Sequence, residues 1–578
     1  MAGGLYRSAN AMPDGVPPPP DGATLISAGP IDQPLVEAVA PAPESPAGGT
    51  AASHSAVMAI GSLVSRGTGF FRQLMLTAAL GTFAVGDAYT TAQIIPGMVY
   101  EFLLGGILTS VLVPVLVRRR KLDPDGGQAY AQRLLTLAVL ALGAAVVLAV
   151  LAAPILTRIY AGGRGRDYEE LVTALSYLLL PILFFSGLSA LVAAVLNTRG
   201  HFAAPMWTPI LNNFVVITTC ALYIAVYGAK IVKPEQMSPG RIVLLGGGTL
   251  LGVAIQAAGL LPSLRKVGFR WRWRFDFRAL GLRELARLGG WMFCYVAVNS
   301  VGLIVLFNLL NQVQDNAAGP IIYNNVFLLL MMAHGIIAVS IITALMPRMS
   351  AAAADGRFAD MAADLSRGIR TVTAVLAPIA VCYAVLAEPI AVSLFDYGAA
   401  QGGASAISPV LLVAALALIP FAISQLFTFA FWAMPDTRMP ALVNIPVVAL
   451  RILLQVIVFV VLSTSFLAAG MMIGNAVSYI AAAVVSAWLL RPRIGRIGLA
   501  VIMKTFGKVL VAALGATLVG LLVVLLLPGE ATSNRWIAIV EVVVGGAVIG
   551  GSYLGLAMLL RIREITEVVG MVRRRLGR

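Results

Sequence analysis

SRGTGFFR, at Ser65–Arg72, interrupts the first long apolar segment of the chain, roughly residues 55–86. A helix needs about 20 apolar residues to cross a bilayer. The clean flanks of the motif, Ala51–Ser65 and Gln73–Gly86, are each too short alone. A helix that spans the membrane at this point therefore carries at least one guanidinium into the hydrocarbon, which costs roughly 2.5–3.5 kcal/mol at the helix centre. Such a charge usually faces a watery cavity, a partner charge or an anionic ligand.

The composition of the whole chain is typical of a polytopic membrane protein. Of its 578 residues, 59% are hydrophobic and only 12% are charged. The long apolar runs lack the alternating pattern of outer-membrane β-strands. We therefore predict an all-α polytopic membrane protein with about 14 transmembrane helices. The predicted spans lie near 55–80, 87–117, 131–157, 169–196, 205–228, 242–263, 288–311, 320–346, 369–395, 406–433, 440–463, 467–490, 505–527 and 536–560.

The basic residues are distributed unevenly between the two sets of connections. Of 41 Lys and Arg residues, 30 fall in one set of alternate loops and the C-terminal end, and seven fall in the opposite set. Cytoplasmic loops carry such an excess, so we expect both termini to be cytoplasmic and the protein to be a multi-pass plasma-membrane protein. The net charge of +15 follows from these loops. We therefore do not expect nucleic acid as a partner.

Three short anchors recur at a nearly constant offset. Pro114 resembles Pro347, Pro154 resembles Pro389 and Arg199 resembles Arg438, at offsets of 233, 235 and 239 residues. An offset of six spans gives two copies with the same orientation, so we predict two parallel six-helix lobes with two extra C-terminal helices. The alternative is that apolar helices joined by proline-containing turns resemble each other by composition alone.

This repeat suggests a division of the chain into six parts. Pro- and Ala-rich tails of low hydrophobicity are usually disordered, and such tails can recruit partner proteins. The predicted parts are a disordered cytoplasmic tail (1–52), an N-lobe (53–264), a basic cytoplasmic linker (265–287), a C-lobe (288–491), a two-helix appendage (492–561) and a basic cytoplasmic tail (562–578).

Three charges are predicted to lie at membrane depth in the first two spans. Arg66 and Arg72 are six residues apart, which places them about 9 Å apart along a helix and about 120° apart around it. Both can border one wide cavity, or one of them can snorkel to the interface. Glu101, deep in the second span, can meet Arg66 at the same depth. It is then either a structural partner or an acid that takes up a proton or cation.

Polar residues also interrupt the later spans. Arg451 lies mid-helix if its span begins near Pro440, or at the cytoplasmic end if the span begins at Ile452. Asn299, Asn324 and Asn325 can bond across helices or line a polar cavity. A histidine such as His334 is more often a packed core residue than a proton relay.

The chemistry of buried arginines favours an anionic substrate. Guanidinium groups match phosphate and carboxylate bidentately, and a diphosphate would compensate most of the charge of Arg66, Arg72 and Arg451. The sequence contains no P-loop, HExxH or GxSxG motif. We therefore expect a transporter without catalytic residues, bound metal or cofactor. Coupling to a Na⁺ gradient, a H⁺ gradient or the membrane potential is left open.

Several motifs resemble the MurJ/MviN family of lipid II flippases. These are Ser65-Arg66-x-x-Gly69-Phe70-x-Arg72, Gly81, Asp87-Ala88, Pro96, Val113-Pro114, Leu196-Asn197-Thr198-Arg199, Leu394-Phe395-x-Tyr397-Gly398 and Asp436-Thr437-Arg438-x-Pro440, and Asp123–Gly127 is similar to actinobacterial members. The resemblance implies the multidrug/oligosaccharidyl-lipid/polysaccharide exporter fold. It also implies export of an undecaprenyl-diphosphate-linked peptidoglycan precursor, lipid II, by alternating access. The partners expected from it are lipid II or a similar polyprenyl-diphosphate glycan, membrane lipids, and cell-wall synthesis proteins bound through the cytoplasmic tails.

The resemblance also implies roles for single residues and reveals departures. Arg66 and Arg72 match first-helix arginines that serve the diphosphate, and Asp87 matches an acidic position of the second helix. However, Glu101 stands where a basic residue is expected, and the expected eighth-helix arginine falls near Leu328. Alternatives are therefore an exporter of another polyprenyl-linked glycan, a MATE-like antiporter, or a non-transporting envelope scaffold.

Overall fold

Every regular element of the described chain is helical. The computed structural model describes residues 50–105, 113–280, 282–312, 317–434, 436–526, 534–567 and 570. Most of the predicted tail 1–52 and most of the basic end after 567 lie outside these ranges. The fold confirms the prediction of an all-α polytopic membrane protein.

The first half of the chain forms the helices that carry residues 50–266. They are α1 (Thr50–Leu80), α2 (Ala84–Tyr100), the π-helical turn η1 (Glu101–Gly105), α3 (Val113–Leu122), α4 (Gln128–Leu151), α5 (Ala153–Ala161), α6 (Arg166–Leu179), α7 (Ile182–Thr198), α8 (Ala203–Tyr227) and α9 (Pro239–Lys266). Short 3₁₀ helices η3 (Pro234–Gln236) and η4 (Phe277–Leu280) lie on either side of α9.

The second half repeats this arrangement and adds two helices. Its elements are α10 (Leu282–Asn311), α11 (Pro320–Ala333), the π-helical turn η5 (His334–Ala338), α12 (Val339–Ala354), α13 (Phe358–Val385), α14 (Ala387–Phe395), η6 (Gly398–Ala400), α15 (Ala404–Ala433), α16 (Arg438–Val461), η7 (Thr464–Phe466), α17 (Leu467–Ile494), α18 (Leu499–Leu526) and α19 (Arg535–Leu559).

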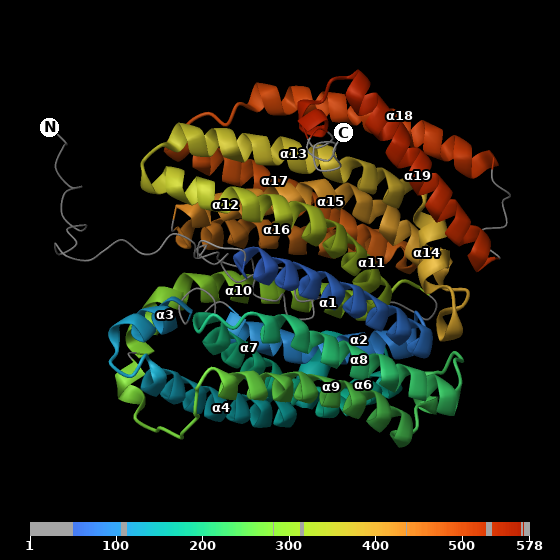
Figure 1. Ribbon diagram of the computed structural model, residues 1–578. Helices are drawn as coiled ribbons and strands as arrows, with labels where there is room; N and C mark the ends of the chain where they lie inside the picture. Colours follow the sequence, from blue (N-terminus) through green and yellow to red (C-terminus); the bar gives the residue numbers. More distant parts are fainter. Residues whose placement is uncertain are drawn as a thin grey trace.

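Twelve helices of the described chain are long and apolar enough to cross a membrane. The first two predicted spans are not among them. α1 carries Arg66, Arg72 and Gln73, which lower its hydropathy, and α2 is a regular helix for only 17 residues before η1 begins. Both nevertheless run alongside the other helices of the bundle, so the helical crossings correspond to the predicted number of about 14 (Figure 1).

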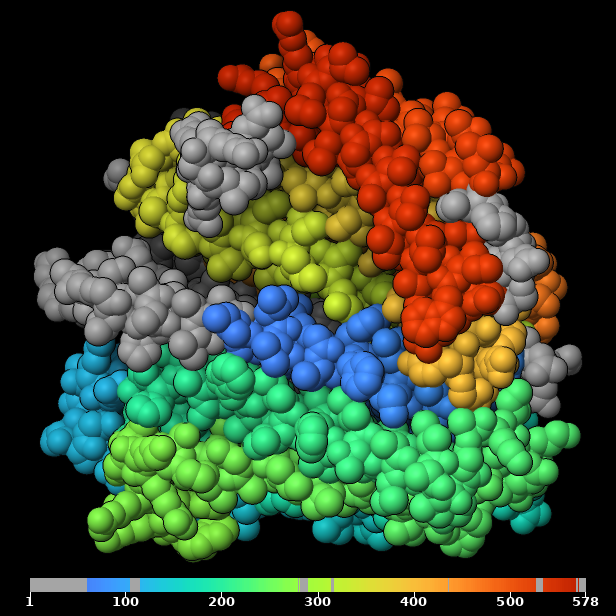
Figure 2. Space-filling model, turned by 45° about the vertical axis from the view of Figure 1, so that its right-hand side comes forward, coloured from blue at the N-terminus to red at the C-terminus, as the bar shows by residue number. Residues whose placement is uncertain are grey.

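The helices gather into two layers with α1 between them. α2 and α4–α9 pack chiefly on each other, as do α10–α17, while α18 and α19 pack on α13 and α14 at the edge of the second layer (Figure 1). In the space-filling view, α1 (blue) follows the seam between the green first-half helices and the yellow second-half helices (Figure 2). α1 is therefore placed to contact both halves.

One end of this seam is closed by close packing and buried polar bonds. We call it the Asp87 side, since Asp87 lies there at the start of α2. Gly81 and Gly398, with φ of +82° and +64°, bring the backbone at the end of α1 against η6 of the other half. On α10, Asn311 donates to Thr91 Oγ1 of α2 and to the Tyr160 carbonyl, each at 3.0 Å. These contacts hold the two halves together at this end.

The two π-helical turns occupy equivalent places in the repeat. Glu101 begins η1 and His334 begins η5, 233 residues later, which is the offset of the Pro114–Pro347 anchor. π-turns within α-helices are rare and are frequent at functional sites. The irregular backbone therefore marks the same level of the second and eighth spans.

Candidate functional site

α1 presents its two arginines on different faces. Gln73 and Thr77 point from α1 toward α11, where both bond to Asn325. Arg66 is seven residues before Gln73 and shares this face, whereas Arg72 is one residue away and turns about 100° from it. The titratable neighbours of Arg72 are Tyr89 of α2 and Cys220 of α8, inside the first half. Arg66 and Arg72 therefore do not line the same surface of a cavity in this structure.

Arg66 lies against the π-helical turn η5 of the opposite half. A methyl group added to Gly335 would overlap the Arg66 guanidinium. His334, beside Gly335, is buried and its ring lies 4.6 Å from that of Phe421. Arg66 is half-buried, so its charge lies at the seam between the halves and not inside either of them. This is the position that a site between two lobes requires.

Glu101 is half-buried at the start of η1, next to α10. The neighbouring Phe102 ring packs edge-on against Phe293 of α10, with centroids 4.8 Å apart. Within the described ranges, no ion pair joins Glu101 to an arginine, so the predicted pairing with Arg66 is not formed in this conformation.

Asp87 has a different place from the expected cavity acid. Its Oδ2 accepts a hydrogen bond from Arg164 Nη1 at 2.7 Å, and its Oδ1 accepts from the Ile321 backbone N–H at 2.9 Å. Asp87 is fully buried and Arg164 is 7% exposed. Ile321 lies in the first turn of α11, where a carboxylate satisfies a free N–H and interacts favourably with the helix dipole. Asp87 thus links the start of α11 to the first half through these two hydrogen bonds.

Of the three predicted asparagines, Asn325 makes a contact between helices and Asn299 lines a pocket. Asn325 is fully buried and bonds to Gln73 at 2.9 Å and Thr77 at 3.0 Å, which links α11 to α1. Its neighbour Asn324 is half-buried on the same helix. Asn299 lines a pocket of the second half and donates to the Tyr295 carbonyl at 3.1 Å.

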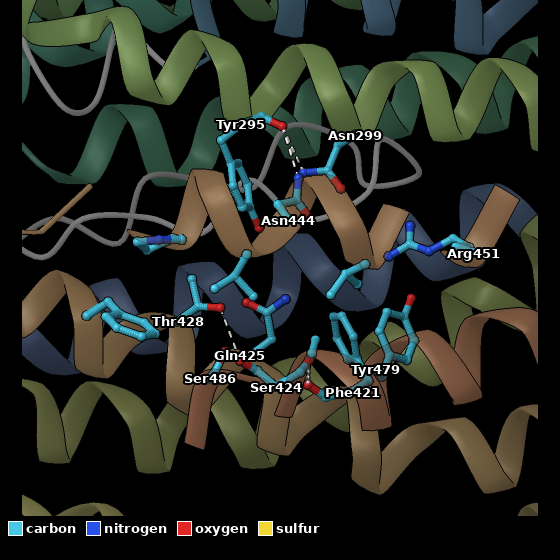
Figure 3. A pocket seen from close by; sticks show the side chains of 15 residues that line it. Tyr295, Asn299, Phe421, Ser424, Gln425, Thr428, Asn444, Arg451, Tyr479 and Ser486 are labelled. Carbon is cyan, nitrogen blue, oxygen red and sulfur yellow. Dashed lines mark hydrogen bonds between the residues drawn. The ribbon is translucent and has the colours of Figure 1, made fainter. Parts of the chain in front are cut away.

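Arg451 lies in the middle of α16, because that helix begins at Arg438 and not at Ile452. It lines an open pocket among α10, α15, α16 and α17. Its Nε donates to Ser478 Oγ at 3.2 Å, and its guanidinium lies 5.4 Å from the centre of the Tyr479 ring. Figure 3 shows Arg451 and Tyr479 together at one end of this pocket.

Among the residues that the structure describes, none that lines the Arg451 pocket is an acid. The lining consists of Tyr295, Asn299, Phe421, Ser424, Gln425, Thr428, Phe431, Pro440, Val443, Asn444, Val447, Arg451, Tyr479, Ala482 and Ser486. A cation–π contact contributes about 0.5–2 kcal/mol. The effective penalty for burying one ion in a protein is several kcal/mol. The local contacts of Arg451 therefore offset only part of that penalty.

The sequence alone did not identify several residues of these sites. Arg164, the partner of Asp87, is one of the seven basic residues in the opposite set of connections, and nothing in the sequence distinguishes it from the others. Glycine has no functional side chain, so the sequence gives no reason to select Gly335. The repeat offset from Glu101 nevertheless points to His334, the residue beside it. Asn444 could have been found, because it is seven residues before Arg451 and so shares its face of α16.

Together, these features define a class of protein. Two packed helical halves, a charged residue at their seam and a polar pocket within one half are the architecture of a multi-pass membrane transporter built from parallel repeats. The family described as lipid II flippase MurJ matches residues 76–543. The chain belongs to the MurJ family.

Relatives and solved structures support this assignment. A probable lipid II flippase MurJ of Synechocystis sp. is 26% identical over 403 residues, which is 68% of this chain and 73% of the relative. The lipid II flippase MurJ of Burkholderia cenocepacia is 25% identical over 394 residues, which is 67% of this chain and 74% of that relative.

The solved structures show similarity of fold. A lipid II flippase MurJ in an inward closed conformation superimposes with a TM-score of 0.69 at 18% identity, covering 90% of this chain and all of that one. An inward-facing MATE family transporter of the MOP superfamily gives 0.60 at 15% identity, covering 74% of this chain and 94% of that one. The predicted exporter fold is therefore confirmed.

Proposed function

We propose that this protein moves lipid II, a polyprenyl-diphosphate-linked cell-wall precursor, from the inner to the outer leaflet of a bacterial plasma membrane by alternating access. Membership of the MurJ family is the observation that carries this proposal. The orientation follows from the basic loops, which place both termini and the end opposite the Asp87 side in the cytoplasm.

Arg66 is the proposed contact for the diphosphate. It comes from α1, lies at the seam and faces Gly335 of the other half. A guanidinium in this position can bind phosphate oxygens from a substrate that enters between the halves. Arg72 is assigned a supporting role, because it lies on the face of α1 that packs within the first half. Arg451 lies in the pocket of the second half, whose lining residues do not include Arg66.

Glu101 is the proposed acid of the coupling step. It begins a π-helical turn beside α10, where a carboxylate can take up a proton or a Na⁺ ion as the halves move. Glu101→Gln keeps the shape and removes the charge. We expect it to lower transport and to weaken its dependence on the coupling gradient, measured in vesicles with an imposed H⁺ or Na⁺ gradient. Unchanged gradient dependence would remove Glu101 from the mechanism.

The proposed function is tested in bacteria depleted of their own lipid II flippase. The unmodified chain should restore growth and return lipid II to the outer leaflet, measured as the fraction of labelled lipid II cleaved by an externally added degrading enzyme. Arg66→Ala should lower that fraction at least tenfold, and Arg66→Lys should restore it partly, since a lysine is a point charge without the bidentate fork.

Arg118→Ala is the matched control, because it removes an exposed arginine from α3. It should leave rescue unchanged. Full rescue by Arg66→Ala at equal protein level would contradict the role of Arg66. If the unmodified chain leaves lipid II on the inner leaflet while another polyprenyl-linked glycan moves, the substrate assignment is wrong.

A further inference from the structure

The Arg451 pocket is formed by helices of the second half, and its lining residue Phe421 packs on His334, the neighbour of Gly335 at the seam. Its lining residues come from α10, α15, α16 and α17, and Arg66 and Gly335 are not among them. A smaller hollow adjoins it, lined by Tyr323, Asn475 and others, and shares Arg451 and Tyr479 with it. Arg451 therefore lies between two adjoining hollows, and the smaller one also includes Tyr323 and Phe327 of α11.

The charge of Arg451 is met only by neutral partners. Among the described residues that line either hollow there is no carboxylate. Ser478 Oγ accepts from Arg451 Nε and itself donates to the Asn475 carbonyl at 2.7 Å. This arrangement fixes the guanidinium in position and leaves its positive charge uncompensated.

Tyr479 supplies a second, independent observation. Its side chain is 5% exposed, its hydroxyl has no hydrogen-bond partner within the described structure, and it lines both hollows. Buried hydroxyl groups are normally bonded, so one left open beside an uncompensated guanidinium indicates a missing acceptor. An acceptor that also carries negative charge satisfies both groups at once.

The rest of the lining can hold a polar ligand of moderate size. Asn299 of α10 and Asn444 of α16 both donate to the Tyr295 carbonyl, at 3.1 and 3.3 Å, which leaves their side-chain oxygens as acceptors (Figure 3). Ser424 and Ser486 add hydroxyl groups. A metal cation does not fit, because the pocket offers a fixed positive charge and no acid.

We propose that the Arg451 pocket is an oxyanion site, in which the terminal nitrogens of Arg451 and the hydroxyl of Tyr479 donate to one phosphate or carboxylate group. The amide and hydroxyl groups around them accept and donate to the remainder of the ligand. The anion is either an acidic group of the lipid-linked substrate or a free anion such as phosphate. In the first case the inference rests on the proposed function, and in the second it stands without it.

The site is tested with purified full-length protein in detergent. The thermal unfolding midpoint and calorimetric affinity are measured with inorganic phosphate, pyrophosphate, a short-chain polyprenyl diphosphate and a neutral disaccharide. At least one anion should bind and raise the midpoint, and the disaccharide alone should not. Binding of the inorganic anions indicates a free-anion site, and binding of the polyprenyl diphosphate alone indicates a lipid-linked group.

Three variants locate the binding. Arg451→Gln should weaken anion binding at least tenfold, and Tyr479→Phe should weaken it several-fold while the ring still packs on Phe421, 4.9 Å away. Arg438→Gln removes an exposed arginine from the start of the same helix and should bind as the unmodified protein does.

The inference is overturned if no anion stabilises the unmodified protein, or if both Arg451→Gln and Tyr479→Phe bind with unchanged affinity. Rescue of depleted cells by a chain that binds no anion would refute this site alone. Failure of rescue by a chain that binds anions through Arg451 would refute the proposed function alone.

Discussion

Replacing Asp87 by Asn tests whether a buried ion pair closes the Asp87 side. The carboxylate is fully buried, accepts from Arg164 at 2.7 Å and from the Ile321 N–H at 2.9 Å. Asn has nearly the same shape, so the change removes the carboxylate charge to which Arg164 Nη1 bonds. Removing one partner of a buried pair typically costs about 3–5 kcal/mol. At 1.4 kcal/mol per factor of ten, the opening equilibrium shifts by roughly two to three and a half orders of magnitude.

Hydrogen–deuterium exchange of the amides at 319–323 measures this opening directly. The Ile321 amide is protected by Asp87 itself, so its exchange rate should rise about 100-fold or more in Asp87→Asn if local opening governs exchange. The matched control is Asp167→Asn, an exposed acid in the first turn of α6, which should change nothing. Adding Arg164→Gln to Asp87→Asn also removes the positive charge of this pair, so the effects of the two changes should be less than additive.

The reasoning is refuted if Asp87→Asn leaves exchange at 319–323 within a few-fold of the unmodified protein. It is also refuted if the change in opening free energy of the Asp87→Asn/Arg164→Gln double variant equals the sum of the changes in the two single variants. The two side chains would then act independently.

Three further changes test the seam and the added helices. Gly335→Ala should displace the Arg66 guanidinium and abolish outer-leaflet lipid II with little loss of thermal stability, whereas Gly143→Ala, in open space on α4, should retain transport. Asn325→Leu should lower stability by about 1–3 kcal/mol in chemical unfolding, since it leaves buried polar groups unbonded; no measurable loss would contradict this. Tyr553→Phe removes a 2.8 Å bond from α19 to a carbonyl of α13, and should cost about 0.5–1.5 kcal/mol in the same assay.

The sequence alone determined the fold class and most helix positions. Placing polar groups in hydrocarbon is costly, and this cost acts locally along the chain. It therefore produces apolar runs that are bounded by prolines, glycines and basic clusters. The predicted span 440–463 is therefore close to α16 at Arg438–Val461, and 536–560 is close to α19 at Arg535–Leu559. The same argument predicted Arg66, Arg72 and Glu101 as charges at membrane depth, and it left Arg451 open between mid-helix and the cytoplasmic end.

Only the tertiary structure decided what each charge faces. Helical periodicity gives the angle between Arg66 and Arg72, but not which neighbouring helix lies at that angle. Packing placed Arg66 at the seam against Gly335 and Arg72 inside the first half. It also paired Asp87 with Arg164, 77 residues away. Such partners depend on contacts between distant segments, and the free energy that fixes them comes from burial of whole helix faces, which no local stretch of sequence contains.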